Sequence, residues 1–218
     1  MIYHKKIELI ITYKLYEYSI YKNTMKIAIL GGSFNPIGNH HIDIIQQLYI
    51  TVDEVWIMPC HKSTTGKKLE SDEHRINMCN IAINKLNSSK IKLCLFEIEN
   101  KLSGQTYDVM EKFCKLYENN KNYKFYFVIG MDNALTINTW DNWEKLINMI
   151  PFIILNRNGY NKESNEYWFT KLPHVYMKNI ITQNESSTKI RNDIKNALTP
   201  NINPDVYKYI ITNKLYTN

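Results

Sequence analysis

The chain has 218 residues, of which 44% are hydrophobic and 22% are charged, and its formal net charge is +6. These fractions are typical of a globular protein and exclude wholesale disorder and collagen-like structure, while the lack of any run of about 18 uncharged apolar residues argues against a membrane-spanning helix. Four cysteines lie far apart with no Cys-x-x-Cys pair, which argues against a disulfide framework or a zinc site and favours a reducing, cytoplasmic location, with the nucleus as the alternative.

The first 24 residues differ from the rest of the sequence. They alternate isoleucine, leucine and tyrosine with lysine and glutamate, and charges such as Lys14 and Glu17 interrupt the apolar run that a signal peptide would need. A regular pattern begins at Met25. We therefore expect residues 1–24 to be an N-terminal extension of unknown role and residues 25–218 to form a single domain.

From residue 26 onward, short apolar runs alternate with segments of helical periodicity. The apolar runs predict strands over residues 26–30, 54–58, 91–98, 124–129, 152–155 and 175–177, and the periodic segments predict helices from about residue 39 and over residues 71–86, 105–117, 143–149, 189–198 and 204–215. In the helix over residues 71–86, Ser71 is the expected cap, and Ile76, Cys79 and Ile83 are the expected buried stripe. This alternation predicts an α/β fold, a Rossmann-like open parallel sheet with helices on both faces.

The turn after the first strand combines glycines with two histidines. Residues 31–41 read Gly-Gly-Ser-Phe-Asn-Pro-Ile-Gly-Asn-His-His. Ligands of open parallel sheets bind at the carboxyl ends of the strands; two glycines allow a ligand close to the backbone, and a helix that begins near Asn39 directs its positive end to the same space. Neither a dinucleotide fingerprint nor a P-loop is present. On these residues alone, an anion site and a tight turn with exposed capping histidines remain alternatives.

The same turn resembles a known signature. Gly-Gly-Ser-Phe-Asn-Pro-Ile followed by His41 is similar to the nucleotidyltransferase superfamily with the (His/Thr)-x-x-His motif, and within it to nicotinamide/nicotinate mononucleotide adenylyltransferases. The resemblance implies that His41 binds ATP phosphates and stabilises the charge that develops during transfer. It also implies that the backbone around Gly32, Ser33 and Phe34 lies against the nucleotides.

One motif position departs from the family pattern. Gly38 stands where the family usually has His or Thr, and His40 stands where Gly or Met is common. A phosphate contact from position 38 is therefore missing, and the sequence leaves open whether His40 replaces it.

A second signature lies near the C-terminus. Residues 186–191, Ser-Ser-Thr-Lys-Ile-Arg, resemble the family's Ile-Ser-Ser-Thr-x-x-Arg motif, with Glu185 in place of the leading Ile. Ser and Thr are natural helix caps, and an arginine one turn later can grip phosphate oxygens in a fork. Taken alone, the segment could be an ordinary capped surface helix. By resemblance, Ser187, Thr188 and Arg191 hold the triphosphate, with Arg191 assisting catalysis beside His41.

Weaker matches lie between the two signatures. Gly130 and Asp132 resemble the family's Gly-x-Asp segment at the ATP site, and Trp140 matches the aromatic that stacks on the pyridine ring, although plain core packing is its alternative and Trp143 is the better core candidate. Lys62 and Thr106 match residues beside the mononucleotide. The resemblance thus implies a mononucleotide site that comprises Ser33, Phe34, Lys62, Thr106 and Trp140.

The implied reaction is adenylyl transfer from ATP to nicotinate mononucleotide, nicotinamide mononucleotide or both, which gives the dinucleotide and pyrophosphate in NAD biosynthesis. Mg²⁺ is expected to arrive with ATP as substrate, held mainly by ATP and water, and the sequence contains no metal-ligand cluster of its own. No nucleic-acid or membrane partner is expected, and a homo-oligomer is left open. The alternatives are a sister enzyme that acts on another phosphorylated acceptor, and a nucleotide-binding regulatory protein with weakened catalysis, which the glycine at position 38 motivates.

Overall fold

The computed structural model describes residues 24–49, 51–157, 167–182 and 185–217. The predicted N-terminal extension therefore lies outside the described residues except for Thr24, as does most of the loop after residue 156. No helix among the described residues is both long enough and apolar enough to cross a membrane.

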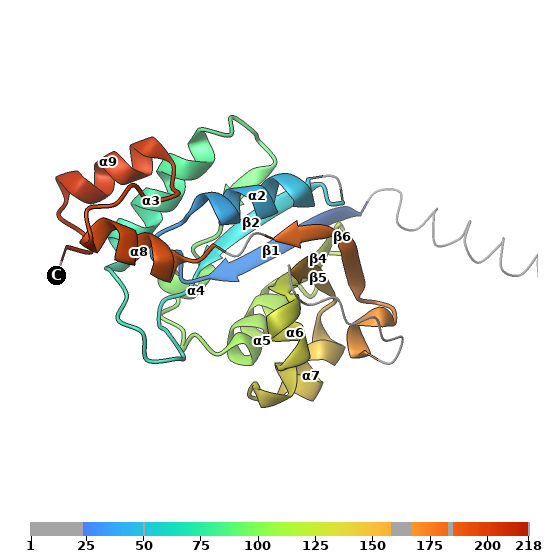
Figure 1. The fold of residues 1–218 in the computed structure, drawn as a ribbon. Coiled ribbons are helices and arrows are strands. Elements are labelled where there is room, and N and C mark those ends of the chain that lie inside the picture. Colours follow the sequence, from blue (N-terminus) through green and yellow to red (C-terminus); the bar gives the residue numbers. More distant parts are fainter. Residues whose placement is uncertain (1–23, 50, 158–166, 183–184, 218) are drawn as a thin grey trace, which may run out of the picture.

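Six parallel strands form one sheet, with the order β3-β2-β1-β4-β5-β6. The strands are β1 (Met25–Gly32), β2 (Glu54–Pro59), β3 (Ile91–Leu93), β4 (Tyr123–Gly130), β5 (Phe152–Arg157) and β6 (Val175–Thr182). The chain runs outward from β1 through β2 to β3 and then returns to place β4 on the other side of β1 (Figure 1). The strand order thus reverses between β1 and β4, which is where ligands bind in folds of this kind.

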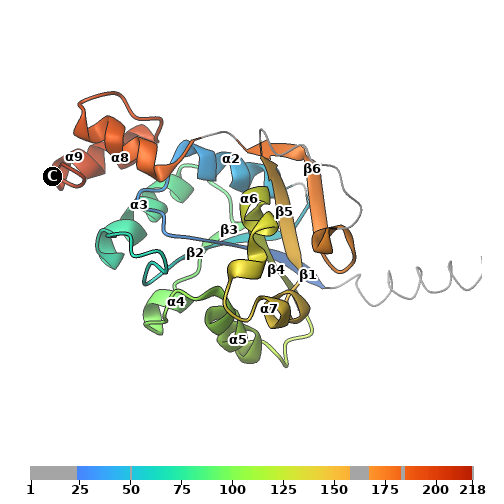
Figure 2. The ribbon, with the colours of Figure 1, turned by 60° about the horizontal axis from the view of Figure 1, so that its bottom comes forward.

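Helices cover both faces of the sheet, as the sequence predicts. They are α2 (Asn39–Leu48), α3 (Asp72–Asn84), α4 (Phe96–Glu99), α5 (Thr106–Leu116), α6 (Met131–Leu135), α7 (Trp143–Met149), α8 (Ser187–Lys195) and α9 (Pro204–Thr212), with short 3₁₀ turns at Ile137–Thr139 and Trp168–Thr170. One layer holds α2, α3, α8 and α9, and the other holds α5, α6 and α7, as the two views show (Figures 1 and 2).

Two hydrophobic cores form because successive strand residues point to opposite faces of the sheet. In β1, Ala28 and Leu30 pack into the core beneath α2 and α3, whereas Ile29 packs into the core beneath α5 and α7. The same alternation continues in β4, where Val128 and Ile129 belong to different cores. Because both faces are buried, the strands read as continuous apolar runs rather than as alternating ones.

The structure corrects the sequence prediction in several places. The strand predicted over residues 91–98 ends at Leu93, and the chain continues into the short helix α4. In α3 the buried face includes Arg75 and Met78 together with Cys79 and Ile83, while Ile76 is only partly buried, so the predicted stripe is wrong by one position at its start. Helix α6 was not predicted, because an apolar stretch this short carries no clear periodicity.

Candidate active site

A cleft of about 540 Å³ opens at the carboxyl ends of β1 and β4. Its walls come from the turn after β1, the first residues of α2 and α8, the segment after β2, and the start of α6. The residues predicted for the site from sequence that line this cleft are Gly32, Ser33, His41, Lys62, Thr106, Gly130, Asp132, Trp140, Ser187, Thr188 and Arg191. Segments up to about 160 residues apart in the sequence thus contribute to one cavity.

Phe34 is the one predicted site residue whose side chain does not line the cleft. Its ring is 1% exposed and packs 5.0 Å from the ring of His41, centroid to centroid. A Cβ atom on Gly32 would lie 3.2 Å from the Phe34 ring, so the glycine leaves room for this packing. The Phe34 ring therefore packs beneath the turn, and Phe34 is not among the residues that line the cleft.

The imidazole of His41 has a defined orientation and charge. The backbone N–H of Gly38 donates to Nδ1 of His41 over 3.0 Å. Desolvation, together with the nearby His40, lowers the pKa of His41 well below its ordinary value, so the ring is neutral at pH 7. Since Nδ1 accepts a hydrogen bond, the proton of the neutral ring lies on Nε2. His41 is thus a hydrogen-bond donor through Nε2 on the wall of the cleft.

Helix α8 is joined to the turn after β1 by its first two turns. Ser187 Oγ donates to the carbonyl of Pro36 over 2.8 Å, and Arg191 Nη1 donates to the carbonyl of Asn35 over 2.8 Å. Arg191 Nη2 also lies 3.1 Å from Thr188 Oγ1. A guanidinium has five N–H donors, so Arg191 retains donors for a ligand, whereas the hydroxyl hydrogen of Ser187 is used within the protein.

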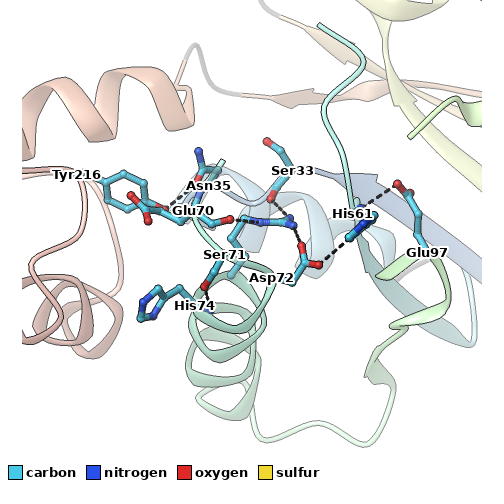
Figure 3. Close-up of polar contacts among 10 residues, drawn as sticks. Ser33, Asn35, His61, Glu70, Ser71, Asp72, His74, Glu97 and Tyr216 are labelled. Carbon is cyan, nitrogen blue, oxygen red and sulfur yellow. Dashed lines mark hydrogen bonds and ion pairs between the residues drawn. The ribbon is translucent and has the colours of Figure 1, made fainter. Parts of the chain in front are cut away.

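Arg75 holds the same turn from the opposite side. Its side chain is 0% exposed; it forms an ion pair with Asp72 and donates to the carbonyls of Ser33 over 2.8 Å and Glu70 over 3.1 Å (Figure 3). Buried charges persist in proteins only when they are paired and hydrogen-bonded. The carbonyl oxygens of residues 33, 35 and 36 therefore all accept hydrogen bonds within the protein. None of them would repel an anionic ligand as an unpaired acceptor.

Asn35 links this turn to the C-terminal end of the chain. Its Oδ1 accepts from Tyr216 Oη over 2.9 Å and from the backbone N–H of Glu70 over 3.1 Å, and its Nδ2 donates to the carbonyl of Lys68 over 3.3 Å (Figure 3). Asn35 is 3% exposed. The amide thus fixes both the segment before α3 and the C-terminal segment to the floor of the cleft.

The polar network that contains Arg75 and Asp72 extends through His61 to Glu97. His61 Nδ1 lies 2.7 Å from Asp72 Oδ2, and the backbone N–H of His61 donates to Glu97 Oε1 over 2.9 Å (Figure 3). Burial raises the pKa of Glu97 to about 7, partly offset by the His61 N–H and by Arg75. Glu97 lines the cleft and was missed from sequence, because a lone glutamate near a short helix carries no signal of burial.

The cleft offers no activated nucleophile or metal cluster among the described residues. Cys60 lines the cleft, but burial raises the pKa of its thiol to about 11, so it is protonated at pH 7. No group of three or more His, Cys, Asp or Glu side chains within the described part of the chain could hold a metal ion. All four cysteines are free.

The segment after β2 forms the second wall of the cleft. Lys62, Thr64 and Lys67 line it, and the carbonyl of Lys62 lies 2.4 Å from the place where a Cβ atom on Gly104 would stand. Gly104 has a φ of +85°, a backbone conformation that residues with a side chain rarely adopt. This close approach places Thr106, at the start of α5, on the same wall. The contribution of Lys67 and Thr64 was not predicted, because no motif marks them.

The two tryptophans have different positions. Trp140 and Trp143 are both partly buried against the core beneath α5 and α7, but only Trp140 lines the cleft. Of these two residues, Trp140 is therefore the one that a ligand in the cleft could reach. At the end of β4, a Cβ atom on Gly130 would lie 2.5 Å from Asp132 Oδ1, so the glycine allows Asp132 to fold back toward the strand end.

Comparisons with known proteins agree with this geometry. A family model described as cytidylyltransferase-like matches residues 29–193. A protein of Clostridium acetobutylicum named "Probable nicotinate-nucleotide adenylyltransferase" is 32% identical over 88% of this chain and 98% of its own length. A protein of Bacillus licheniformis with the same name is 33% identical, again over 88% of this chain and 98% of its own length.

Solved structures give the same result. The structure of Plasmodium falciparum nicotinic acid mononucleotide adenylyltransferase complexed with NaAD is 30% identical, covers 88% of this chain and 97% of that chain, and superposes with a TM-score of 0.68. The same enzyme complexed with APC gives a TM-score of 0.67 at 30% identity. The fold, the motifs and these relatives agree, and the chain belongs to the nicotinate-nucleotide adenylyltransferases, a family of nucleotidyltransferases with a cytidylyltransferase-like domain.

Proposed function

We propose that this chain transfers the adenylyl group of ATP to nicotinate mononucleotide, with nicotinamide mononucleotide as a second acceptor. The observation that carries this proposal is the convergence of His41, Arg191 and Trp140 on one cleft, although they come from three different parts of the chain. Two of these side chains suit phosphates and the third suits a planar ring. The relatives named above support the choice of a pyridine mononucleotide as acceptor.

The proposed chemistry is a direct displacement at phosphorus. An oxygen of the mononucleotide phosphate attacks the α-phosphorus of ATP, and the bond from that phosphorus to the bridging oxygen breaks, so that pyrophosphate leaves. The attacking phosphate is already anionic at pH 7, so no general base is required. The residues then act by aligning the two phosphates and neutralising charge, which is how phosphoryl-transfer sites generally work.

Each side of the cleft has a proposed role in this reaction. Through Nε2–H, His41 donates to an ATP phosphate oxygen, and through its remaining N–H groups, Arg191 binds the triphosphate. Thr188 joins it through its hydroxyl and Ser187 through its backbone N–H, because the Ser187 hydroxyl donates to Pro36. Gly32, Ser33 and the backbone of Phe34 lie against the nucleotides. Gly130 and Asp132 bind the adenosine, with Asp132 accepting from a ribose hydroxyl.

On the other wall, Trp140 stacks on the pyridine ring, and Lys62 and Thr106 bind the rest of the mononucleotide.

Mg²⁺ enters this proposal as part of the ATP substrate. The carboxylates that line the cleft, Glu97, Asp132 and Glu185, do not form a cluster that could hold a metal ion. Mg²⁺ at nucleotide sites is usually held by substrate phosphates, waters and at most one or two carboxylates, so in this proposal ATP and water supply most of its ligands.

The test is an assay of the purified chain with Mg²⁺, ATP and one acceptor at a time. The acceptors are nicotinate mononucleotide, nicotinamide mononucleotide, and phosphopantetheine as the acceptor of a sister enzyme. We expect equal amounts of dinucleotide and pyrophosphate with the pyridine mononucleotides and no product with phosphopantetheine. ATP binding without pyrophosphate release from any acceptor would contradict the proposal and support a nucleotide-binding regulatory protein.

A further inference from the structure

Gly38 is distinguished by its surroundings and not by its backbone conformation. Its φ of −111° and ψ of 173° are extended values that any residue can adopt. A Cβ atom there would nevertheless lie 2.8 Å from Nδ1 and 2.9 Å from Cε1 of His40, and 2.4 Å from Cδ1 of Ile190. The ring of His40 thus occupies the space that a side chain at position 38 would enter.

His40 lies beside His41 on the wall of the cleft. The two ring centroids are 3.9 Å apart, and both residues line the cavity within the first turn of α2. The charge of His40 contributes to the lowered pKa of His41, so the two imidazoles interact electrostatically. Two adjacent imidazoles at the positive end of a ten-residue helix form a favourable place for an anion.

We propose that His40 contacts a phosphate group of the bound nucleotide, and that Gly38 and His40 form an exchanged pair in which the ring from position 40 replaces the side chain missing at position 38. This inference rests on the proposed function, because it assigns His40 to the same site. It explains how a chain without His or Thr at the first motif position still presents two side chains to the phosphates. It also removes the main reason to regard the site as weakened.

The test is a mutant cycle in which Ile190→Val serves as the reference chain, since that change removes the Cδ1 atom that would obstruct position 38. The variants are His40→Ala, Gly38→Thr, and Gly38→Thr combined with His40→Gly. We expect each single change to lower kcat/KM for ATP by about tenfold to a hundredfold, the usual effect of losing a hydrogen bond to a charged group. The combined change should restore kcat/KM to within about threefold of the reference, so that the two effects are strongly non-additive.

Binding measurements separate a phosphate contact from damage to the cleft. By calorimetry, His40→Ala should weaken binding of Mg²⁺-ATP by about tenfold and leave adenosine, which has no phosphate, unchanged. His74→Ala is the matched control: His74 also lies in the first turn of a helix, but contacts Tyr209 and does not line the cleft. It should leave both affinities unchanged.

Two results would overturn the inference. One is a His40→Ala chain that keeps its kcat/KM and its ATP affinity within about twofold of the reference. The other is a combined variant that is as impaired as the product of the two single effects, which would show that positions 38 and 40 do not exchange roles. If the wild-type chain makes no dinucleotide, the proposed function fails, but the comparison of ATP with adenosine still decides whether His40 contacts phosphate.

Discussion

The two walls of the cleft are built in different ways. The wall formed by the turn after β1 is fixed by hydrogen bonds from Arg75, Arg191 and Ser187 to backbone carbonyls, and by Tyr216 through Asn35. The opposite wall, with Lys62, Thr106 and Trp140, is less tightly tied: Ser63 and Glu97 accept from nearby backbone N–H groups, but the side chains of Lys62, Thr106 and Trp140 make no hydrogen bond within the described part of the chain.

The two walls are suited to two different tasks, the stabilisation of charge and the recognition of a planar ring. A site that stabilises charge in a transition state must be preorganised, because reorganisation during the reaction would cost the energy that catalysis needs. A site that recognises a planar ring needs a complementary surface and little more. After their proposed roles, we call the wall formed by the turn after β1 the phosphate wall and the wall with Lys62, Thr106 and Trp140 the pyridine wall. We expect changes in the phosphate wall to lower kcat or stability, and changes in the pyridine wall to weaken binding of the mononucleotide.

The largest effect is expected from Arg75→Met, which removes the cation that fixes the phosphate wall. The change leaves the carbonyls of Ser33 and Glu70 without their buried donor and leaves Asp72 with His61 as its remaining partner, so the free energy of unfolding should fall by about 3–5 kcal/mol. Chemical denaturation measures this. Lys85→Met is the control, because its ion pair with Asp205 is exposed and is worth about 1 kcal/mol or less. A loss from Arg75→Met no larger than that of the control would show that the wall is not fixed in this way.

His41→Asn should have the next largest effect, on turnover alone. The Asn side-chain oxygen can accept from the Gly38 N–H as Nδ1 does, but the variant has no group in place of Nε2–H. We expect kcat to fall by about a hundredfold to a thousandfold, as when an oxyanion-stabilising donor is removed, with the thermal midpoint nearly unchanged. Steady-state kinetics check this, and a kcat close to that of the wild type would exclude His41 as the donor.

On the pyridine wall, Trp140→Ala should weaken mononucleotide binding by about tenfold, within the range of 1–3 kcal/mol that stacking contributes per base. Affinity for ATP and the thermal midpoint should change little. Trp143→Ala is the matched control, since Trp143 packs against the same core without lining the cleft; it should lower the thermal midpoint and leave mononucleotide affinity intact. Calorimetric titration distinguishes them, and the reverse pattern would show that the stacking residue is misassigned.

The smallest effect concerns Glu97, which lies on the pyridine wall and accepts from the backbone N–H of His61. Its folded-state pKa is raised from 4.5 to about 7, so as the pH rises from 4.5 to 7 the unfolded chain releases this proton before the folded chain does, and stability is lost over that interval. Glu97→Gln cannot titrate. The wild type should therefore lose about 1 kcal/mol relative to Glu97→Gln between pH 5 and pH 6. Denaturation at both pH values measures the difference, and a constant or opposite difference would contradict the raised pKa.

The same difference between the walls explains what could be predicted from sequence. The phosphate wall combines glycines, a helix start and charged residues in short motifs. Their resemblance to a family signature led to His41 and Arg191, and both residues line the cleft. The alternation of strand and helix patterns along the chain likewise predicted a parallel sheet with helices on both faces.

Other features could not be predicted, for physical reasons. The full burial of Arg75 depends on acceptors supplied by Ser33 and Glu70, which only the folded chain brings together. The pyridine wall is assembled from single residues on separate elements, so Lys67 and Glu97 carry no local signal. The strand predicted over residues 91–98 ends early, because an apolar run alone does not distinguish a strand from a short helix such as α4.

The central claim, that His41 promotes transfer of the adenylyl group to a pyridine mononucleotide, is tested most directly by following labelled phosphorus. The purified chain and its His41→Asn variant are incubated with Mg²⁺, nicotinate mononucleotide and ATP that carries the label at either the α- or the γ-phosphorus. We predict that the α label enters the dinucleotide, that the γ label enters pyrophosphate at the same rate, and that the variant loses both together. An α label that never reaches the dinucleotide, or a variant that transfers it as fast as the wild type, would contradict the claim.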